Sequence, residues 1–278
     1  MQNDFQFDVN FDTRSDTPLK SDGTIKDPDG YSKTLNLFHK LLWSKQLPNG
    51  EIFKLITGKK PSGWLTLEHS GSNGEFVLTS DAFGLTFRGW NDMQKIINEF
   101  KQLNPKEFEL FVKKCSTIGG YIIFPGLKKK LENGKSLWTM NQARGVANSP
   151  LKDRIDLALE CIRLYYENID SPLFSTIKAY SEFFALFNDF EGYTKFFLLD
   201  DLVSENYLNV KFFLPFDGFK KTTGKWNIIR NDISDKSSKL TNGFPKDLTE
   251  YKKFKTNMMN FIISRNIRIN NWFNKNYL

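Results

Sequence analysis

Cysteine and histidine are scarce in this sequence, and their scarcity excludes several kinds of site. The 278 residues include two cysteines, Cys115 and Cys161, and two histidines, His39 and His69. The cysteines do not form a CxxC pair, so we expect neither a zinc site nor a disulfide framework. With two histidines, a Ser-His-Asp triad has little support, and we predict no metal site.

Long apolar runs are also missing. No window approaches the roughly 20 apolar residues that a membrane-spanning helix needs. The opening residues, MQNDFQFD, lack the basic and apolar regions of a signal peptide. The pair Gly119-Gly120 is not followed by the GK[ST] ending of a phosphate-binding P-loop. We therefore expect a cytoplasmic protein without a membrane partner.

The residues that are abundant indicate a folded, basic protein. Hydrophobic residues make up 40% of the chain and aromatic residues 15%, which is a globular composition and not a disordered one. The net charge of +7 keeps nucleic acid open as a partner. Lysine and asparagine are frequent while alanine and arginine are sparse, so an AT-rich genome explains the basicity equally well.

Hydrophobic periodicity predicts an α+β protein, with a strand-rich N-terminal half packed on a helix-rich C-terminal half. Strands are predicted at residues 5–11, 52–57, 64–69, 75–79, 117–126, 137–140 and 209–216. Helices are predicted at residues 32–43, 91–100, 105–114, 149–168, 171–188, 193–203 and from 248 onward. Residues 12–30 and 217–244 are expected to be irregular. We predict one domain over residues 1–278, with residue 116 as the place where a subdivision would fall.

The helix at residues 149–168 contains the most informative contradiction in the sequence. Ser149 suits an N-cap and Pro150 the first helical position. Arg154, about a turn and a half into this helix, projects into its apolar arc. Asp156 and Glu160 are assigned to the opposite, solvated face. A buried arginine cannot shed its charge, so Arg154 must meet an anion.

Two kinds of anion would satisfy Arg154. The first is an internal Asp or Glu partner, which we rank higher. The second is a ligand phosphate or carboxylate, which a guanidinium clamps with two hydrogen bonds. Arg265 raises the same question, because it occupies a position of the last helix where an apolar residue was due.

The polar residues before the central helix fit two interpretations equally well: they satisfy the backbone of their own loop, or they bind a ligand. Asn141, Gln142 and Arg144 lie on the predicted strand-to-helix connection, and helix N-termini attract anions. Together with Arg154 and Arg265 they predict a site for an anionic small molecule or nucleotide, without identifying a cofactor. If the protein is an enzyme, it would act by positioning and electrostatics, with His39 as candidate acid or base.

Several sequence blocks resemble a known family. They include DPDGYSKTLNLFHKLLWSKQLPNGEIFKL, TIGGYIIFPG, WTMNQARG, DRIDLALECIRLYY and FIISRNIRI. Over nearly its whole length the chain resembles a family of bacterial cytosolic proteins that is described only as a domain of unknown function. The resemblance implies one bacterial intracellular domain and brings no activity or catalytic residue with it.

Two other functions compete with anion binding. One is a non-enzymatic interaction module, in a toxin–antitoxin or phage-defence setting, whose arginines form internal salt bridges. The other is a nucleic-acid-binding protein or nuclease that uses the basic C-terminal helix. The basic residues of that helix are Lys252, Lys253, Lys255, Arg265, Arg268 and Lys275.

Overall fold

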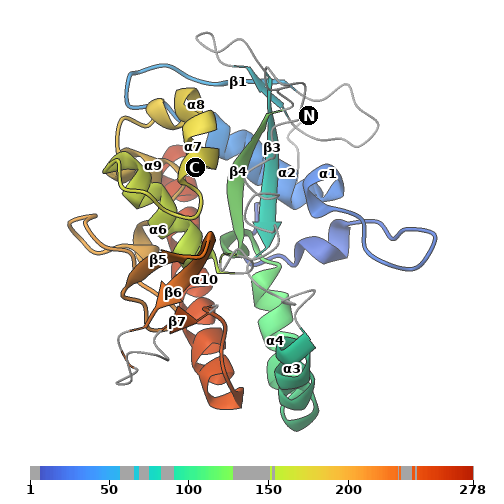
Figure 1. The fold of residues 1–278 in the computed structure, drawn as a ribbon. Coiled ribbons are helices and arrows are strands. Elements are labelled where there is room, and N and C mark those ends of the chain that lie inside the picture. Colours follow the sequence, from blue (N-terminus) through green and yellow to red (C-terminus); the bar gives the residue numbers. More distant parts are fainter. Residues whose placement is uncertain are drawn as a thin grey trace.

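A long C-terminal helix and an antiparallel sheet form the centre of the protein (Figure 1). The computed structural model describes residues 7–56, 66–68, 75–82, 91–127, 151, 154–230, 232, 240–241 and 243–277. Its helices include α1 (Pro28–Tyr31), α2 (Lys33–Trp43), α3 (Asn91–Leu103), α4 (Pro105–Cys115), α6 (Ile155–Tyr166), α7 (Phe174–Ala179), α8 (Ser181–Ala185), α9 (Phe190–Phe196) and α10 (Leu248–Tyr277). Short 3-10 turns are η1 (Thr13–Asp16), η2 (Ile118–Gly120) and η3 (Asp200–Leu202). The predicted α+β class is confirmed.

The larger sheet has the strand order β1-β2-β3-β4 and is antiparallel throughout. Its strands are β1 (Lys54–Ile56), β2 (Thr66–Glu68), β3 (Glu75–Ala82) and β4 (Tyr121–Leu127). The strands predicted between residues 52 and 79 are confirmed. The first four residues of β4 are buried, as the unbroken apolar run YIIF requires. Helix α1 lies beside β3, and α6 to α9 lie beyond β4 (Figure 1).

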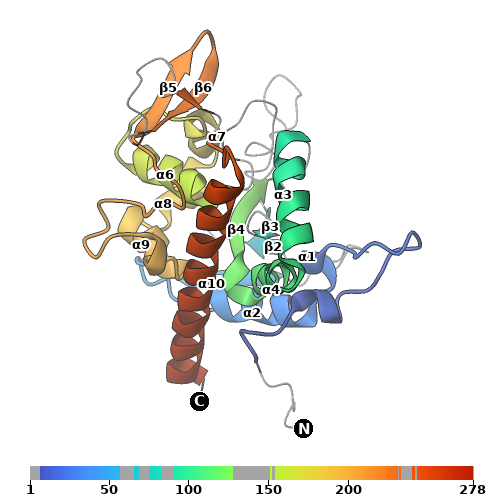
Figure 2. The same ribbon diagram turned by 90° about the horizontal axis from the view of Figure 1, so that it is seen from below.

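Helix α10 passes between the α3–α4 pair and the group formed by α6, α8 and α9 (Figure 2). Its N-terminus is capped by Asp247, whose carboxylate accepts a hydrogen bond of 2.9 Å from the Glu250 backbone amide. One face of the helix is buried at Tyr251, Phe254, Met258, Phe261 and Arg265. This helix therefore serves as the common wall of both halves.

An aromatic cluster fills the space between α2 and the helices α7 to α9. Trp43 of α2 is fully buried and lies against Phe53, Phe183, Phe196 and Phe197 at centroid distances of 4.8 to 6.3 Å. Offset and edge-on aromatic pairs of this kind add stabilisation beyond area burial. The abundance of phenylalanine in the sequence is thus explained by one continuous core.

The predicted N-terminal strand is wrong over its described part, residues 7–11. Phe7 and Val9 are buried as the alternation required, but the backbone forms a turn. The Asp8 carboxylate accepts a hydrogen bond from the Asn10 amide, and the Asp8 carbonyl accepts one from Phe11. A side chain that bonds its own backbone in this way replaces the strand ladder.

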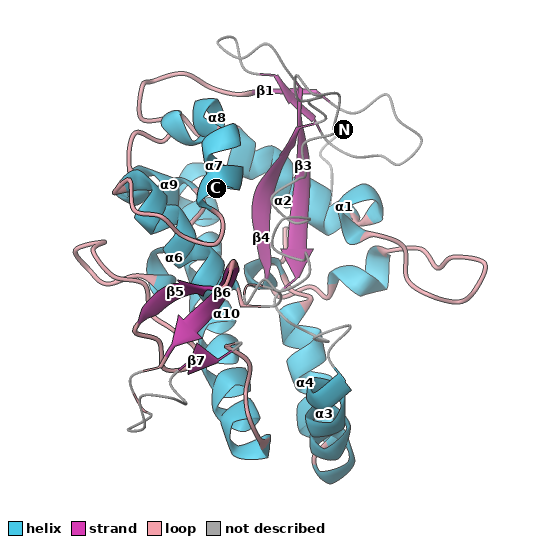
Figure 3. Ribbon diagram, in the orientation of Figure 1, coloured by secondary structure: helices cyan, strands magenta, loops and turns pink. Residues whose placement is uncertain are grey.

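The predicted distribution of strands between the two halves is also wrong. The N-terminal half contains α1 to α4 besides its sheet, and the C-terminal half contains a second sheet (Figure 3). This sheet has the order β5-β6-β7, with β5 (Gly218–Thr222), β6 (Lys225–Ile229) and β7 (Leu240–Thr241). It lies in the segment predicted to be irregular, whereas residues 209–216, predicted as a strand, form none. Thr223 and Gly224 have φ of 48° and 80°, which closes a tight hairpin.

Gly119 and Gly120 mark a close backbone approach, although η2 replaces the predicted strand there. A Cβ on Gly119 would lie 2.6 Å from the Ile262 carbonyl oxygen and 2.6 Å from Asn266 Oδ1. The Gly119 amide donates to Asn266 Oδ1 at 2.6 Å, and Asn266 Nδ2 donates to Thr117 Oγ1 at 2.9 Å. One buried asparagine thereby fastens α10 to the segment that precedes β4.

Replacing this asparagine should destabilise the protein. Asn266→Ala leaves the buried Gly119 amide unsatisfied, so we expect the free energy of unfolding to fall by about 2 to 3 kcal/mol. Asn260→Ala, at an exposed position of the same helix, should change it by less than about 0.5 kcal/mol. Urea unfolding followed by circular dichroism measures both. Equal losses in the two variants would contradict the fastening role.

Candidate functional site

Arg154 is buried, as predicted, but it stands just before its helix. Helix α6 begins at Ile155, and Arg154 occupies the N-cap position, so the prediction of a helix running from residue 149 with Arg154 inside it is wrong. The Arg154 side chain is 1% exposed. Ser149 and Pro150, the predicted start, lie outside the described residues.

The partner of Arg154 is an internal carboxylate. Arg154 Nε donates to Asp156 Oδ1 at 2.9 Å, and Nη2 donates to Asp156 Oδ2 at 2.6 Å. A third bond runs from Nη1 to the Gly243 carbonyl. Asp156 is also buried and accepts a bond from the Phe213 amide, so its assignment to a solvated face was wrong. Of the two anions considered, the internal one is present.

Arg265 is satisfied by backbone carbonyl groups. Its Nε donates to Leu198 O at 3.0 Å, and its Nη2 donates to Phe197 O at 3.0 Å. Its Nη1 donates to the carbonyls of Gly119 and Tyr121. The side chain is fully buried, and this desolvation lowers its pKa to about 10.

The other three residues of the predicted anion site, Asn141, Gln142 and Arg144, lie outside the described residues. Arg154 and Arg265 use different partners on different segments. Binding of a ligand by these five residues therefore stays a prediction.

His39 has a partner that the sequence did not reveal. His39 Nε2 lies 3.3 Å from Asp29 Oδ1, and both side chains are buried. The same carboxylate accepts hydrogen bonds from the Ser80 amide, at 2.6 Å, and from the Ser80 hydroxyl. The serine and the histidine thus contact the same carboxylate oxygen, Asp29 Oδ1, and the role of His39 as an acid or base stays a prediction. His39 Nδ1 is buried without a hydrogen-bond partner.

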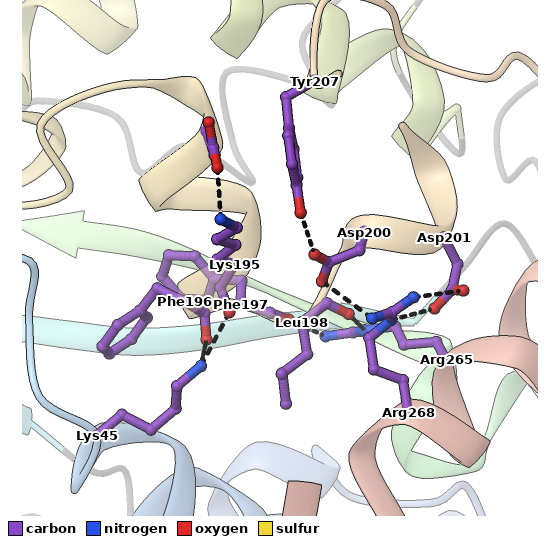
Figure 4. Close-up of polar contacts among 11 residues, drawn as sticks. Lys45, Lys195, Phe196, Phe197, Leu198, Asp200, Asp201, Tyr207, Arg265 and Arg268 are labelled. Carbon is purple, nitrogen blue, oxygen red and sulfur yellow. Dashed lines mark hydrogen bonds and ion pairs between the residues drawn. The ribbon is translucent and has the colours of Figure 1, made fainter. Parts of the chain in front are cut away.

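Two cations, the buried Arg265 and the half-buried Lys45, bind the C-terminal end of α9 (Figure 4). The last carbonyls of a helix have no partner within it and carry partial negative charge. Lys45 Nζ donates to the carbonyls of Lys195 and Phe196 at 2.9 and 2.6 Å. Arg265 binds the next two carbonyls, those of Phe197 and Leu198. Four consecutive carbonyl groups are therefore satisfied by two side chains from α10 and from the end of α2.

A second layer of charges surrounds this end of α9. Arg268 on α10 donates to both oxygens of Asp201, at 2.7 and 3.0 Å. Asp200 accepts a hydrogen bond of 2.8 Å from the Tyr207 hydroxyl and lies 3.7 Å from Arg268 Nη1. Figure 4 shows these pairs beside Arg265. They hold η3 against α10.

Lys45 also borders a cleft of about 430 Å³. The lining residues are Lys45, Gln46, Leu47, Pro48, Phe187, Asn188, Asp189, Glu191, Gly192, Lys195 and Phe196. Lys45 Nζ lies 5.0 Å from the Phe196 ring centroid and 5.5 Å from that of Trp272. Burial among these groups lowers the pKa of Lys45 to about 8. A shifted ammonium group in a cleft is a candidate binding residue.

Nothing in the sequence marked Lys45 as a binding residue. The one indication was its position directly after an amphipathic helix, where a basic side chain can bind the terminal carbonyl groups of that helix or of another. The carbonyl groups that Lys45 binds lie 150 and 151 positions further along the chain. That separation hid the contact.

Metal and thiol chemistry have no visible basis in the described part of the chain. No group of three or more His, Cys, Asp or Glu side chains there could hold a metal ion. Cys115 and Cys161 are free and buried, and burial raises the pKa of Cys161 to about 12 and that of Cys115 further. Among the described helices, none is long and apolar enough to cross a membrane.

Breaking the buried ion pair should be costly for folding. Arg154→Met leaves the Asp156 carboxylate buried without its cation, so we expect a loss of about 3 to 5 kcal/mol of unfolding free energy. The double variant Arg154→Met/Asp156→Asn should recover part of that loss, because the stranded charge is removed. A double-mutant cycle by urea unfolding measures the coupling. Additive effects would argue against the pair.

Comparison with known proteins gives a match to one protein family. No curated protein and no solved structure matches this chain. The family of unknown function DUF6994 matches residues 7–269, nearly the whole sequence. That span includes both sheets, the cleft beside Lys45 and the two buried arginines. The chain therefore belongs to the DUF6994 family.

Proposed function

We propose that the protein binds a small anionic ligand, bearing a phosphate, sulfate or carboxylate group, in the cleft beside Lys45. The ligand is still the anion predicted from the sequence, but its main contact is Lys45 instead of Arg154 and Arg265. Arg154 already has a carboxylate and Arg265 already has four carbonyls. Lys45 is half-buried, borders this cleft and forms no ion pair with any described residue.

Counting of donors supports this proposal. A lysine ammonium has three N–H donors. Lys45 uses two of them for the carbonyls of Lys195 and Phe196. Within the described residues it forms no ion pair, although the charge of the Asp200 carboxylate acts on it and raises its pKa, against the larger effect of burial. The third donor is available to a ligand in the cleft.

The acidic residues of the cleft are already engaged. Asp189 caps α9, since its Oδ1 accepts a hydrogen bond of 2.7 Å from the Gly192 amide. Glu191 pairs with Lys195 one turn later on the exposed surface of α9. The remaining wall includes Leu47 and Phe187, which are apolar. A ligand with an anionic group and a short apolar body fits this combination.

The two competing functions have less support. The basic C-terminal helix offers fewer free cations than its sequence implied, because Lys255 pairs with Glu107 and Arg268 with Asp201. This weakens the nucleic-acid alternative. The internal pairing of Arg154 fits an interaction module, but no described feature specifies the partner of such a module. Binding of a small anion is the function we retain.

Removal of the ammonium group should abolish anion binding. For Lys45→Met we expect the affinity for sulfate to fall about tenfold or more, which corresponds to the loss of one charge-assisted hydrogen bond. Lys40→Met, an exposed lysine of α2, is the matched control and should retain wild-type affinity. Isothermal titration calorimetry at low salt measures both, with circular dichroism to confirm folding. Equal affinities in a folded Lys45→Met protein would refute the proposal.

Anion binding should depend on pH through Lys45. Its pKa is lowered from 10.5 to about 8 in the folded protein, so the ammonium form is lost as pH rises through that value. Sulfate keeps its charge over this range, and its affinity should therefore be constant well below pH 8 and decline above it. Calorimetric titrations at a series of pH values test this, and a flat profile would exclude Lys45 as the ligand.

The same shift predicts how stability changes without ligand. Between about pH 8 and 10.5 the unfolded chain holds a proton on Lys45 that the folded chain has released. Stability therefore gains from rising pH in this window. Buried tyrosines such as Tyr193, whose pKa burial raises, act in the opposite direction. The contribution of Lys45 is the difference between wild type and Lys45→Met in urea unfolding, and it should grow with pH.

A further inference from the structure

A second cleft, of about 400 Å³, is lined by residues of α6 and of the segment that leads into β5. Three half-buried phenylalanines, Phe212, Phe216 and Phe219, line it. The centroids of Phe212 and Phe216 are 4.4 Å apart, and those of Phe216 and Phe219 are 4.9 Å apart. Their exposed surfaces form an aromatic wall that is not used by the core.

The charge of this cleft is opposite to that of the protein. Three carboxylates line it, from Glu160, Asp170 and Asp217, against one guanidinium, that of Arg163. Arg163 is already bound by Glu160, through two bonds of 2.8 Å, and by Glu167. Asp170 and Asp217 are exposed and form no ion pair with any described residue. Two carboxylates are thus free to meet a cation, in a chain whose net charge is +7.

We propose that this cleft binds a small organic cation, an ammonium group carried on an aliphatic chain. The faces of aromatic rings attract cations, and ammonium ligands are commonly recognised by such rings together with nearby carboxylates. The aliphatic part has apolar surface to cover, since Leu164 lines the cleft and Ile169 at its rim is 47% exposed. An anion would be repelled by Asp170 and Asp217.

The surroundings favour a small molecule over a basic peptide. Gly218 and Phe219 of β5 border the cleft, and β5 is an edge strand of its sheet in the described chain. The next two residues of β5, Lys220 and Lys221, are exposed and would repel a peptide rich in basic residues. The volume of the cleft falls within the range of small-molecule pockets, about 300 to 1,000 Å³.

Matched ligands test the proposal. The probes are n-pentylammonium, 1-pentanol and pentanoate, which share one aliphatic chain and carry a positive, zero and negative charge. We expect n-pentylammonium to shift the NMR signals of Phe216 and Phe219 and to bind at least about tenfold more tightly than the other two. Its affinity should also weaken as salt is added. Equal binding of all three probes would overturn the proposal.

Matched variants locate the site. Asp217→Asn removes one exposed charge with almost no change in shape, and it should weaken n-pentylammonium about threefold to tenfold. Phe216→Leu should weaken it as well, because the ring face is lost. Glu182→Gln, an exposed acid on α8, is the control and should have no effect. Unchanged affinity in a folded Asp217→Asn protein would overturn the assignment.

Two further outcomes separate the possible ligands. If a peptide with one lysine bound more tightly than n-pentylammonium, the assignment to a small molecule would be wrong. Lys45→Met should leave n-pentylammonium binding unchanged, because Lys45 lines the other cleft. Loss of amine binding in that variant would contradict a separate cation site, whatever the result with sulfate.

Discussion

The guanidinium of Arg265 joins three distant parts of the chain through their backbone carbonyls. It extends from α10 and binds carbonyl groups that follow α9 and others that flank the start of β4. A buried guanidinium without acceptors would be very costly. Helix α10 can therefore lie only where these carbonyls converge. The position of α9 against β4 is set by the same contacts, since both supply oxygens to one planar group.

Most of the buried charged groups in the described chain are likewise satisfied by other groups of the protein. Arg154 is paired with Asp156, and Arg230 is held between Asp232 and Glu250. Such pairs contribute little net stability compared with apolar groups, but removing one partner is expensive. They therefore select one arrangement of the chain over others. Lys45 differs from these pairs because its acceptors are neutral carbonyl groups, as those of Arg265 are, and it also borders a cleft.

The two clefts present opposite chemistry to the solvent. The cleft beside Lys45 combines an incompletely satisfied ammonium group with apolar walls. The cleft beside Phe216 combines aromatic faces with unpaired carboxylates. Both lie next to helices of the aromatic C-terminal half, which provides a rigid support. The segment after α2 supplies Lys45 to one cleft, and the segment that leads into β5 supplies Phe216 and Asp217 to the other.

The sequence by itself determined the burial of many apolar side chains and of Arg154 and Arg265. Helical spacing placed Arg154 and Arg265 among apolar residues, and alternation placed Phe7 and Val9 in the core. These results follow from local periodicity, which the hydrophobic effect imposes on each element. Element types were less secure where side chains bond their own backbone, as Asp8 does, or where a turn such as Thr223-Gly224 forms a hairpin.

Only the tertiary structure decided what the buried polar groups contact. Asp156 was assigned to solvent because it lies on the polar face of its helix, yet it is buried, and Arg154 and the Phe213 amide bind its carboxylate. Asp29 reaches Ser80 across 51 positions, and Lys45 reaches the end of α9 across about 150. Contacts between residues so far apart in the sequence produce no periodic pattern in it, because the chain that connects them can have many lengths and paths. Burial is a property of one element, whereas a bonded partner is a property of the whole fold.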